Sequence, residues 1–187
     1  MKNLEIEAKY INIDPEKIGD KLRSLGFDLI YREFDVFRAT LICRDPAMDL
    51  RVRKEYGKIT MTYKYTNLER WALGTEEIEV EVENFEKAVA ILIKAHNPKR
   101  VLYQESKREL WRKWETEVSI DEWPGTGKYV EIESPTEKEL ISTTESLGLD
   151  YADALFGRVW CVYAALWYNV DEINRIEHLT FENPPRK

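Results

Sequence analysis

The sequence predicts an α+β fold, an antiparallel eight-stranded closed or nearly closed β-barrel that forms a tunnel, with helices packed outside. Two observations lead to this expectation. Segments that alternate apolar and charged residues recur along the chain, as strands do when one face is buried and the other is wet. Acids and bases also gather on different strands, with few neutral polar residues between them. A wet, charged lumen with aliphatic side chains outside, beneath helices, explains both observations.

The first half of the chain alternates strands with helices. Asp14, Pro15 and Glu16 provide an N-cap acid, a proline at the first helical position and an acid in the first turn, so a helix begins there and ends at Gly26. Tyr56-Gly57-Lys58 separates two alternating runs and predicts a hairpin. The expected strands are 4–10, 27–43, 50–55, 59–66 and 76–83, and a second helix is expected at 85–95.

The second half repeats this scheme without a detectable sequence repeat. Pro124-Gly125-Thr126-Gly127 predicts a turn, and Ser134-Pro135-Thr136-Glu137 begins a helix that ends near Gly148. The aromatic segment 151–168 predicts a further helix, whose spacing is typical of core packing or of a subunit contact, such as that of a homodimer. Strands are expected at 101–114, 116–123 and 128–133.

Composition sets limits on the kind of protein. Of 187 residues, 43% are hydrophobic and 34% are charged, which fits a folded domain at 1–170 followed by a polar C-terminal tail at 171–187, poorly ordered at 177–187. A net charge of −7 argues against a general nucleic-acid binder. The two cysteines lack metal-ligand or disulfide spacing, and no apolar run approaches the roughly 18 residues of a membrane span. We therefore expect a cytoplasmic protein without nucleic-acid or membrane partners.

The first strand shows the charge pattern in full. Glu5, Glu7 and Lys9 share one face at intervals of about 7 Å, and the residues between them are apolar. A solvated edge strand would show the same alternation, so the later strands decide between the two interpretations. The same rule groups Arg51 with Arg53; Thr60 with Thr62 and Lys64; Glu77 with Glu79 and Glu81; Glu117 with Ser119 and Asp121; and Glu131 with Glu133. A solvated sheet has no need for an Arg-x-Arg strand.

A lumen that holds both acids and bases indicates a ligand that binds both. Carboxylates bind hard divalent cations through oxygen, and Arg and Lys bind phosphate oxygens. Mg²⁺ is typically held by one or two carboxylates together with substrate phosphates. The pattern therefore indicates a metal-bound polyphosphate.

Several motifs occur in one order along residues 4–155. They are Glu5-Ile6-Glu7-Ala8-Lys9, Asp35-Val36-Phe37, Leu50-Arg51-Val52-Arg53, Thr62-Tyr63-Lys64, Glu77-Ile78-Glu79, Asp121, and 125–133 with its Gly-x-Gly-x-x-x-Glu-x-Glu pattern. This ordered set resembles the CYTH superfamily, the triphosphate tunnel metalloenzymes. That family includes class IV adenylyl cyclases, thiamine triphosphatases and inorganic triphosphatases.

The resemblance implies a role for each matched residue. Divalent-cation ligands, for Mg²⁺ or Mn²⁺, would be Glu5, Glu7, Glu79, Asp121, Glu131 and Glu133. Triphosphate contacts would be Lys9, Arg51, Arg53, Lys64 and Arg108. The residues implied in catalysis are Glu5, Glu7, Lys9, Arg51, Arg53 and Lys64.

One stretch departs from the family pattern. The family usually carries Lys-x-Arg after the central helix, whereas this chain reads Ser106-Lys107-Arg108-Glu109. Either Arg108 faces the lumen and Ser106 replaces the lysine, or Lys107 faces the lumen and Glu109 replaces the arginine. We favour Arg108, because Trp111 then falls where the family carries an aromatic residue.

Three functions are consistent with this pattern. The leading hypothesis is a metal-dependent triphosphatase that acts on inorganic, nucleoside or thiamine triphosphate. The second is an adenylyl cyclase, which would use the same cradle but also needs a base pocket that the sequence does not identify. The third is a module that binds a triphosphate or nucleotide without turnover.

Overall fold

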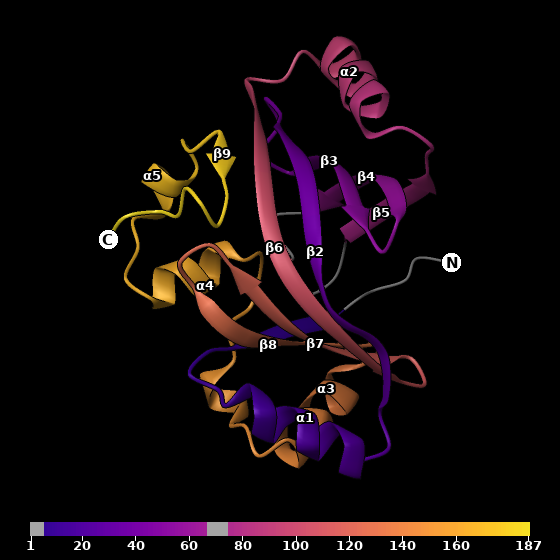
Figure 1. The fold of residues 1–187 in the computed structure, drawn as a ribbon, viewed down its shortest axis with the longest axis vertical. Helices are drawn as coiled ribbons and strands as arrows, with labels where there is room; N and C mark the ends of the chain where they lie inside the picture. The colour runs from indigo at the N-terminus through magenta and orange to yellow at the C-terminus, as the bar shows by residue number, and fades with distance from the viewer. Residues whose placement is uncertain (1–5, 67–74) are drawn as a thin grey trace. The chain divides into compact units, whose positions relative to one another are not determined.

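The computed structural model describes residues 6–66 and 75–187 (Figure 1). Contacts divide this chain into two compact units. The first unit contains residues 35–66, 75–106 and 171–185, and the second contains 6–34, 107–170 and 186–187. The two longest strands, β2 (Asp28–Ile42) and β6 (Arg100–Lys113), contribute residues to both units.

The second unit is an antiparallel sheet with helices on one face. Its strands follow the order β1 (Ile6–Tyr10), β8 (Gly127–Ser134), β7 (Thr116–Trp123) and β6. The helices α1 (Pro15–Ser24) and α3 (Glu137–Ser146) contact β8 and lie beside each other in Figure 1. Asp14 and Thr136 cap these helices, each accepting a hydrogen bond from a backbone N–H three residues on.

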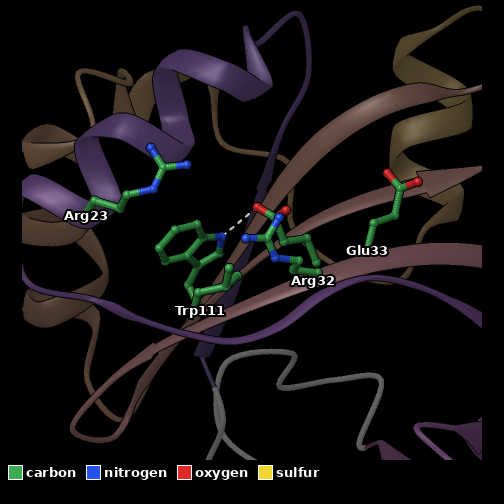
Figure 2. A pocket seen from close by; sticks show the side chains of 6 residues that line it. Arg23, Arg32, Glu33 and Trp111 are labelled. Carbon is green, nitrogen blue, oxygen red and sulfur yellow. Dashed lines mark hydrogen bonds between the residues drawn. The ribbon is translucent and has the colours of Figure 1, made fainter.

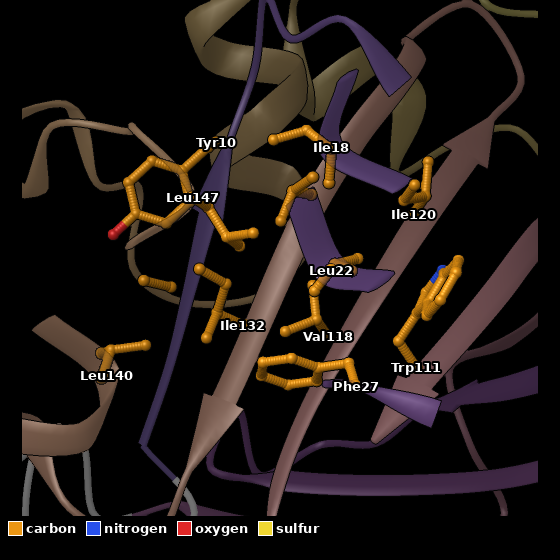
Figure 3. Close-up of a cluster of buried hydrophobic side chains, with 12 residues drawn as sticks. Tyr10, Ile18, Leu22, Phe27, Trp111, Val118, Ile120, Ile132, Leu140 and Leu147 are labelled. Carbon is orange, nitrogen blue, oxygen red and sulfur yellow. The ribbon is translucent and has the colours of Figure 1, made fainter. Parts of the chain in front are cut away.

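The apolar sides of these elements meet in one core (Figure 3). Strand residues that point towards the helices pack against the apolar stripe of α1, as the two periodicities predict. The Tyr10 hydroxyl shares a hydrogen bond of 2.9 Å with Thr144 of α3. The buried members of this core are Ala8, Tyr10, Ile18, Leu22, Phe27, Trp111, Val118, Ile120, Val130, Ile132, Leu140 and Leu147.

Truncating the centre of this core should be costly. Leu22 is fully buried, so Leu22→Ala is expected to lower the free energy of unfolding by about 2–5 kcal/mol through lost burial and a residual cavity. Ile91, on an exposed helix face, is the matched control, and Ile91→Ala should change it by less than about 0.5 kcal/mol. Urea denaturation of both variants measures the difference, and equal losses would contradict this assignment of the core.

The first unit repeats the arrangement with its own helix. The strands β3 (Met48–Glu55), β4 (Lys58–Thr66) and β5 (Thr75–Glu81) follow β2 in antiparallel order. The helix α2 (Phe85–His96), capped by Asn84, packs on β2 and β3. Its core contains Ala39, Leu41, Leu50, Val52, Phe85, Ala88, Val89 and Leu92.

Along the main path of the sheet the strand order is β1-β8-β7-β6-β2-β3-β4-β5. The pairs β1–β8, β8–β7, β7–β6, β2–β3, β3–β4 and β4–β5 are all antiparallel. The prediction of an antiparallel α+β fold is therefore confirmed. In the described part of the chain no hydrogen-bonded pairing joins the end strands β1 and β5. The closed or nearly closed barrel therefore stays a prediction.

The helix expected at 151–168 is wrong. The structure contains a single 3₁₀ turn, η1 (Tyr151–Asp153), and a short helix, α4 (Trp160–Ala165). Between them Leu155 exchanges two backbone hydrogen bonds of 2.9 Å with Lys9, and Gly157 adopts φ +101°. A backbone already paired with β1, followed by a residue in a conformation that favours glycine, cannot continue a helix.

The expectation of a poorly ordered tail is also wrong. The chain forms α5 (Val170–Ile173) and then β9 (His178–Leu179), which pairs in parallel with β6 at Tyr103 and Gln104. Leu179 is buried, and His178 stacks on the Tyr103 ring at 5.2 Å between centroids. A strand of two residues is too short to show a period in the sequence. No helix in the residues described here combines the length and apolarity needed to cross a membrane.

Candidate functional site

Each unit has a charged face opposite its core. In the second unit, alternation places the core residues on one side of β1, β8, β7 and β6. The other side carries the polar residues, and register brings them opposite one another: Lys9 faces Glu131, Glu7 faces Glu133, and Arg108 faces Asp121. The grouping of Glu7 with Lys9, and of Glu131 with Glu133, on one face is confirmed.

Five of these side chains form a continuous network across four strands. Arg108 donates from Nε and Nη2 to the two carboxylate oxygens of Asp121, at 2.7 and 2.6 Å. Its Nη2 also reaches Glu131 Oε1 at 3.1 Å. Lys9 Nζ lies 3.0 Å from Glu131 Oε2 and 3.0 Å from Glu7 Oε1. Acids and bases therefore alternate, and Glu131 bridges the two cations.

Lys9 and Asp121 of this network are buried, and ion pairing keeps its two cations charged. Burial by itself lowers the pKa of Lys9, but the nearby charges of Glu131 and Glu7 outweigh this effect and raise it. Burial likewise lowers the pKa of Arg108, and Asp121 and Glu131 together raise it well above its ordinary value. Both cations thus remain protonated at neutral pH although only 3% of the Lys9 side chain is exposed.

A row of carboxylates begins at Glu7, the acid at one end of this network. Glu7 on β1, Glu133 on β8 and Glu117 on β7 occupy directly opposed positions on the charged face. Glu117 is engaged by Arg112, whose Nε donates to it at 2.7 Å. Directly opposed like charges on neighbouring strands repel each other. A cation between Glu7 and Glu133 would relieve that repulsion.

These oxygens suit a hard divalent cation, but only together with a ligand. Within 6–66 and 75–187, no group of three or more His, Cys, Asp or Glu side chains is placed to hold an ion. Mg²⁺ is commonly held by one or two carboxylates and completed by substrate phosphates and water. The opposed pair Glu7 and Glu133 fits that donor set. Glu5, the other acid predicted in the first strand, lies outside the described residues.

In the first unit the charged face is rich in bases. Register places Arg51 and Arg53 of β3 opposite Thr62 and Thr60 of β4, away from the aliphatic core, as the sequence predicts. Arg53 Nη2 contacts Glu55 at 2.8 Å. In the part of the chain that the structure describes, the buried Nε of Arg51 has no hydrogen-bond partner. This orphaned donor indicates a position where an anion would be accepted.

Acids of β5 line the edge of the same face. Lys64 Nζ contacts Glu77 at 2.6 Å, and Thr62 Oγ1 donates to Glu79 at 2.8 Å. Glu79 also lies 3.7 Å from Arg53 Nη2. Glu79 therefore balances bases of the first unit, whereas the other predicted metal ligands, Glu7, Asp121, Glu131 and Glu133, belong to the second.

The structure distinguishes the two alternatives for the Lys-x-Arg departure. Arg108 lies on the charged face, as we favoured, and Lys107 pairs with Glu122 on the opposite face. Glu109 also faces away, and there it accepts a 2.7 Å hydrogen bond from Trp111 Nε1. Ser106 is buried in the first unit and accepts a hydrogen bond from Arg38.

Glu109 and Trp111 line a pocket of about 380 Å³ in the second unit (Figure 2). Arg23 of α1 lies over the Trp111 ring, 5.6 Å from its centroid, and Lys128 pairs with Glu33 at the margin. Glu109 and Trp111 are on the helix-covered face, opposite Arg108. The pocket is thus separate from the charged face.

Sequence reasoning missed Arg38, a base on the charged face of the first unit. The sequence predicts a strand at 27–43, and within it the run Phe37 to Leu41 alternates apolar and polar residues in the same way as the strands with charged faces. Register places Arg38 opposite Arg53 and Thr40 opposite Arg51. The alternation within β2 was the signal that could have found it.

Comparison with known proteins gives the family. No family model matches the sequence. A putative adenylate cyclase of Methanocaldococcus jannaschii is 33% identical over 134 residues, which are 70% of this chain and 76% of that protein. A Pyrococcus horikoshii protein of known structure shares 25% identity with a TM-score of 0.60, over 78% of this chain and 91% of the other.

A putative adenylate cyclase from Vibrio parahaemolyticus has the same fold, with a TM-score of 0.70 at 12% identity, over 88% of this chain and 99% of its own. The motif order, the two charged faces and the identity to the archaeal relative agree with one another. The chain belongs to the CYTH superfamily.

Proposed function

We propose that the protein is a divalent-metal-dependent triphosphatase. The carrying observation is the base-rich face of the first unit, where Arg51 and Arg53 lie side by side and the buried Nε of Arg51 lacks a partner among the described residues. Several guanidinium groups exceed what one phosphate requires, so a tri- or polyphosphate fits better than a mono- or diphosphate. Inorganic, nucleoside and thiamine triphosphate share the group recognised.

The proposal extends to the closed barrel. In such a barrel, residues of the base-rich face and of the Lys9–Glu131–Arg108 network would act on one triphosphate. Substitutions on either face would then weaken the binding of the same ligand. If substitutions on one of the two faces left triphosphate binding unchanged, that result would count against a closed barrel.

In this mechanism, bases orient the substrate and acids position the attacking water. Arg51, Arg53 and Lys64 would hold the triphosphate oxygens, and Lys9 and Arg108 would fix Glu131 and Asp121 in place. Glu7 and Glu133 would hold Mg²⁺ or Mn²⁺, which supplies neutralisation of phosphate charge. A carboxylate of the charged face orients water towards the terminal phosphorus. The new P–O bond forms as the terminal phosphoanhydride bond breaks, and a triphosphate yields phosphate and a diphosphate.

Adenylyl cyclase is the second candidate, favoured by the name of the 33% identical relative. In that reaction the ribose 3′-hydroxyl attacks the α-phosphorus and pyrophosphate leaves. Incubation with ATP and with inorganic triphosphate in the presence of Mg²⁺, followed by product analysis, separates the candidates. Phosphate release supports the triphosphatase, cyclic AMP with pyrophosphate supports the cyclase, and binding without turnover supports a binding module.

Inorganic triphosphate is expected to compete with ATP. The charged faces present groups that bind phosphate, and the triphosphate is the part that ATP and inorganic triphosphate share. Titration calorimetry with Mg²⁺ present should show ATP displaced by inorganic triphosphate, with monophosphate as the control that does not displace it. Tight ATP binding that inorganic triphosphate cannot displace would show that the site recognises the nucleoside, and the cyclase would then be preferred.

A further inference from the structure

A third arginine lies beside the two in the Arg-x-Arg motif. Arg38 on β2 is directly opposite Arg53 on β3, on the face that points away from the core of the first unit. The next pair on this face, two residues further along β2, is Thr40 opposite Arg51. Side chains of directly opposed residues have Cβ atoms about 4.5–5.5 Å apart, so the two guanidinium groups can reach a common anion.

A buried hydroxyl fixes the position of Arg38. Its Nη2 donates to Ser106 Oγ at 2.6 Å, and Ser106, on β6, is only 3% exposed. The neighbouring Thr40 is fixed in the same way, by donating to Gln104 at 3.0 Å. The Ser106 contact orients the Arg38 guanidinium through a neutral hydroxyl, whereas Arg53 is oriented by an ion pair with Glu55.

We infer that Arg38 is a further substrate-binding residue, which holds an oxygen of a phosphate group jointly with Arg53. This inference rests on the proposed function. Opposed like charges destabilise a strand pair. A phosphate oxygen between Arg38 and Arg53 would accept one charge-assisted hydrogen bond from each guanidinium. The buried Ser106 hydroxyl holds Arg38 ready for this contact before the ligand arrives.

The geometry allows a reciprocal test. Because Arg38 Nη2 lies 2.6 Å from Ser106 Oγ, a lysine at position 106 would carry its ammonium into the space that the Arg38 guanidinium occupies. A lysine at position 106 on β6 can thus replace the positive charge that is removed at Arg38 on β2. Such a rescue depends on charge at that place and not on the arginine side chain itself.

The variants are Arg38→Gln, Arg38→Gln with Ser106→Lys, and Lys54→Gln, which removes a positive charge from the opposite, exposed face of β3. Calorimetry measures binding of inorganic tripolyphosphate with Mg²⁺, and hydrolysis assays measure KM and kcat. Arg38→Gln is expected to raise Kd and KM by about tenfold or more, the loss of one charge-assisted hydrogen bond. The double variant should return to within about threefold of the wild type, and Lys54→Gln should bind like the wild type.

Unchanged binding by Arg38→Gln would overturn the inference while leaving the triphosphatase intact. A weakened Arg38→Gln that Ser106→Lys does not rescue, together with a lower thermal midpoint, would show a structural role and also overturn it. If Arg38→Gln does not fold, Ser106→Ala replaces it; about threefold weaker binding is expected from the loosened guanidinium, and unchanged binding would overturn the inference. A wild-type protein that binds no tripolyphosphate overturns both proposals.

Discussion

Removing the divalent cation with excess EDTA is expected to lower the rate of phosphate release from inorganic triphosphate by about a hundredfold or more. The charged triphosphate and the opposed carboxylates Glu7 and Glu133 would otherwise repel each other, because both are anionic. Added Mg²⁺ or Mn²⁺ in excess of the chelator should restore the rate. The measurement is a phosphate-release assay at fixed ionic strength, and full activity in EDTA would contradict the metal proposal.

Glu133→Gln should act at the same step. The substitution keeps the size of the side chain and removes its charge on the polar face, so it should raise the Mg²⁺ concentration needed for half-maximal activity by about tenfold or more. The fold should be retained, because Glu133 lies opposite the core of the second unit. Glu145→Gln, on the exposed side of α3, is the control. Identical Mg²⁺ dependence of the two variants would exclude Glu133 as a ligand.

The second large effect is expected at Arg51. A well-formed charge-assisted hydrogen bond contributes roughly 1.5–3 kcal/mol, so Arg51→Ala should lower kcat/KM for triphosphate by about ten- to a hundredfold. The buried Nε of Arg51 lacks a partner among the described residues, so the loss should appear in substrate use more than in stability. Steady-state kinetics and thermal unfolding of the same variant measure the two effects.

The matched comparison is Glu81→Ala, an exposed residue at the end of β5 in the same unit. It should change kcat/KM by less than about threefold, because a solvated charge contributes little. An Arg51→Ala variant as active as Glu81→Ala would remove Arg51 from the substrate contacts.

The faces of the strands could be predicted because alternation is a local property. Residues two apart in a strand share a face whatever the strand pairs with, so Glu7 with Lys9 and Arg51 with Arg53 could be grouped from the sequence alone. Arg108 over Lys107 followed from the same rule, once one aromatic neighbour set the register of the family motif. The structure confirms these groupings.

The partners across strands could not be predicted in the same way. Lys9 meets Glu131 because β1 pairs with β8, and that pairing depends on register between segments far apart in the chain. Both carboxylate oxygens of Asp121, a predicted metal ligand, accept hydrogen bonds from Arg108, and no spacing in the sequence predicts that contact. The break at Gly157 could not be predicted, because the aromatic residues around it recur every three to four positions, as they do in a helix.

The two backbone hydrogen bonds between Lys9 and Leu155 have a consequence for the order of events during synthesis. Lys9 leaves the ribosome before its strand and bridge partners, which follow roughly 120 to 150 residues later, a delay of about 6–30 s at 5–20 residues per second. During that interval β1 has neither β8 nor Leu155 to pair with. Lys9, whose side chain is 3% exposed in the folded protein, therefore begins in water, and it is desolvated only after synthesis has passed Leu155.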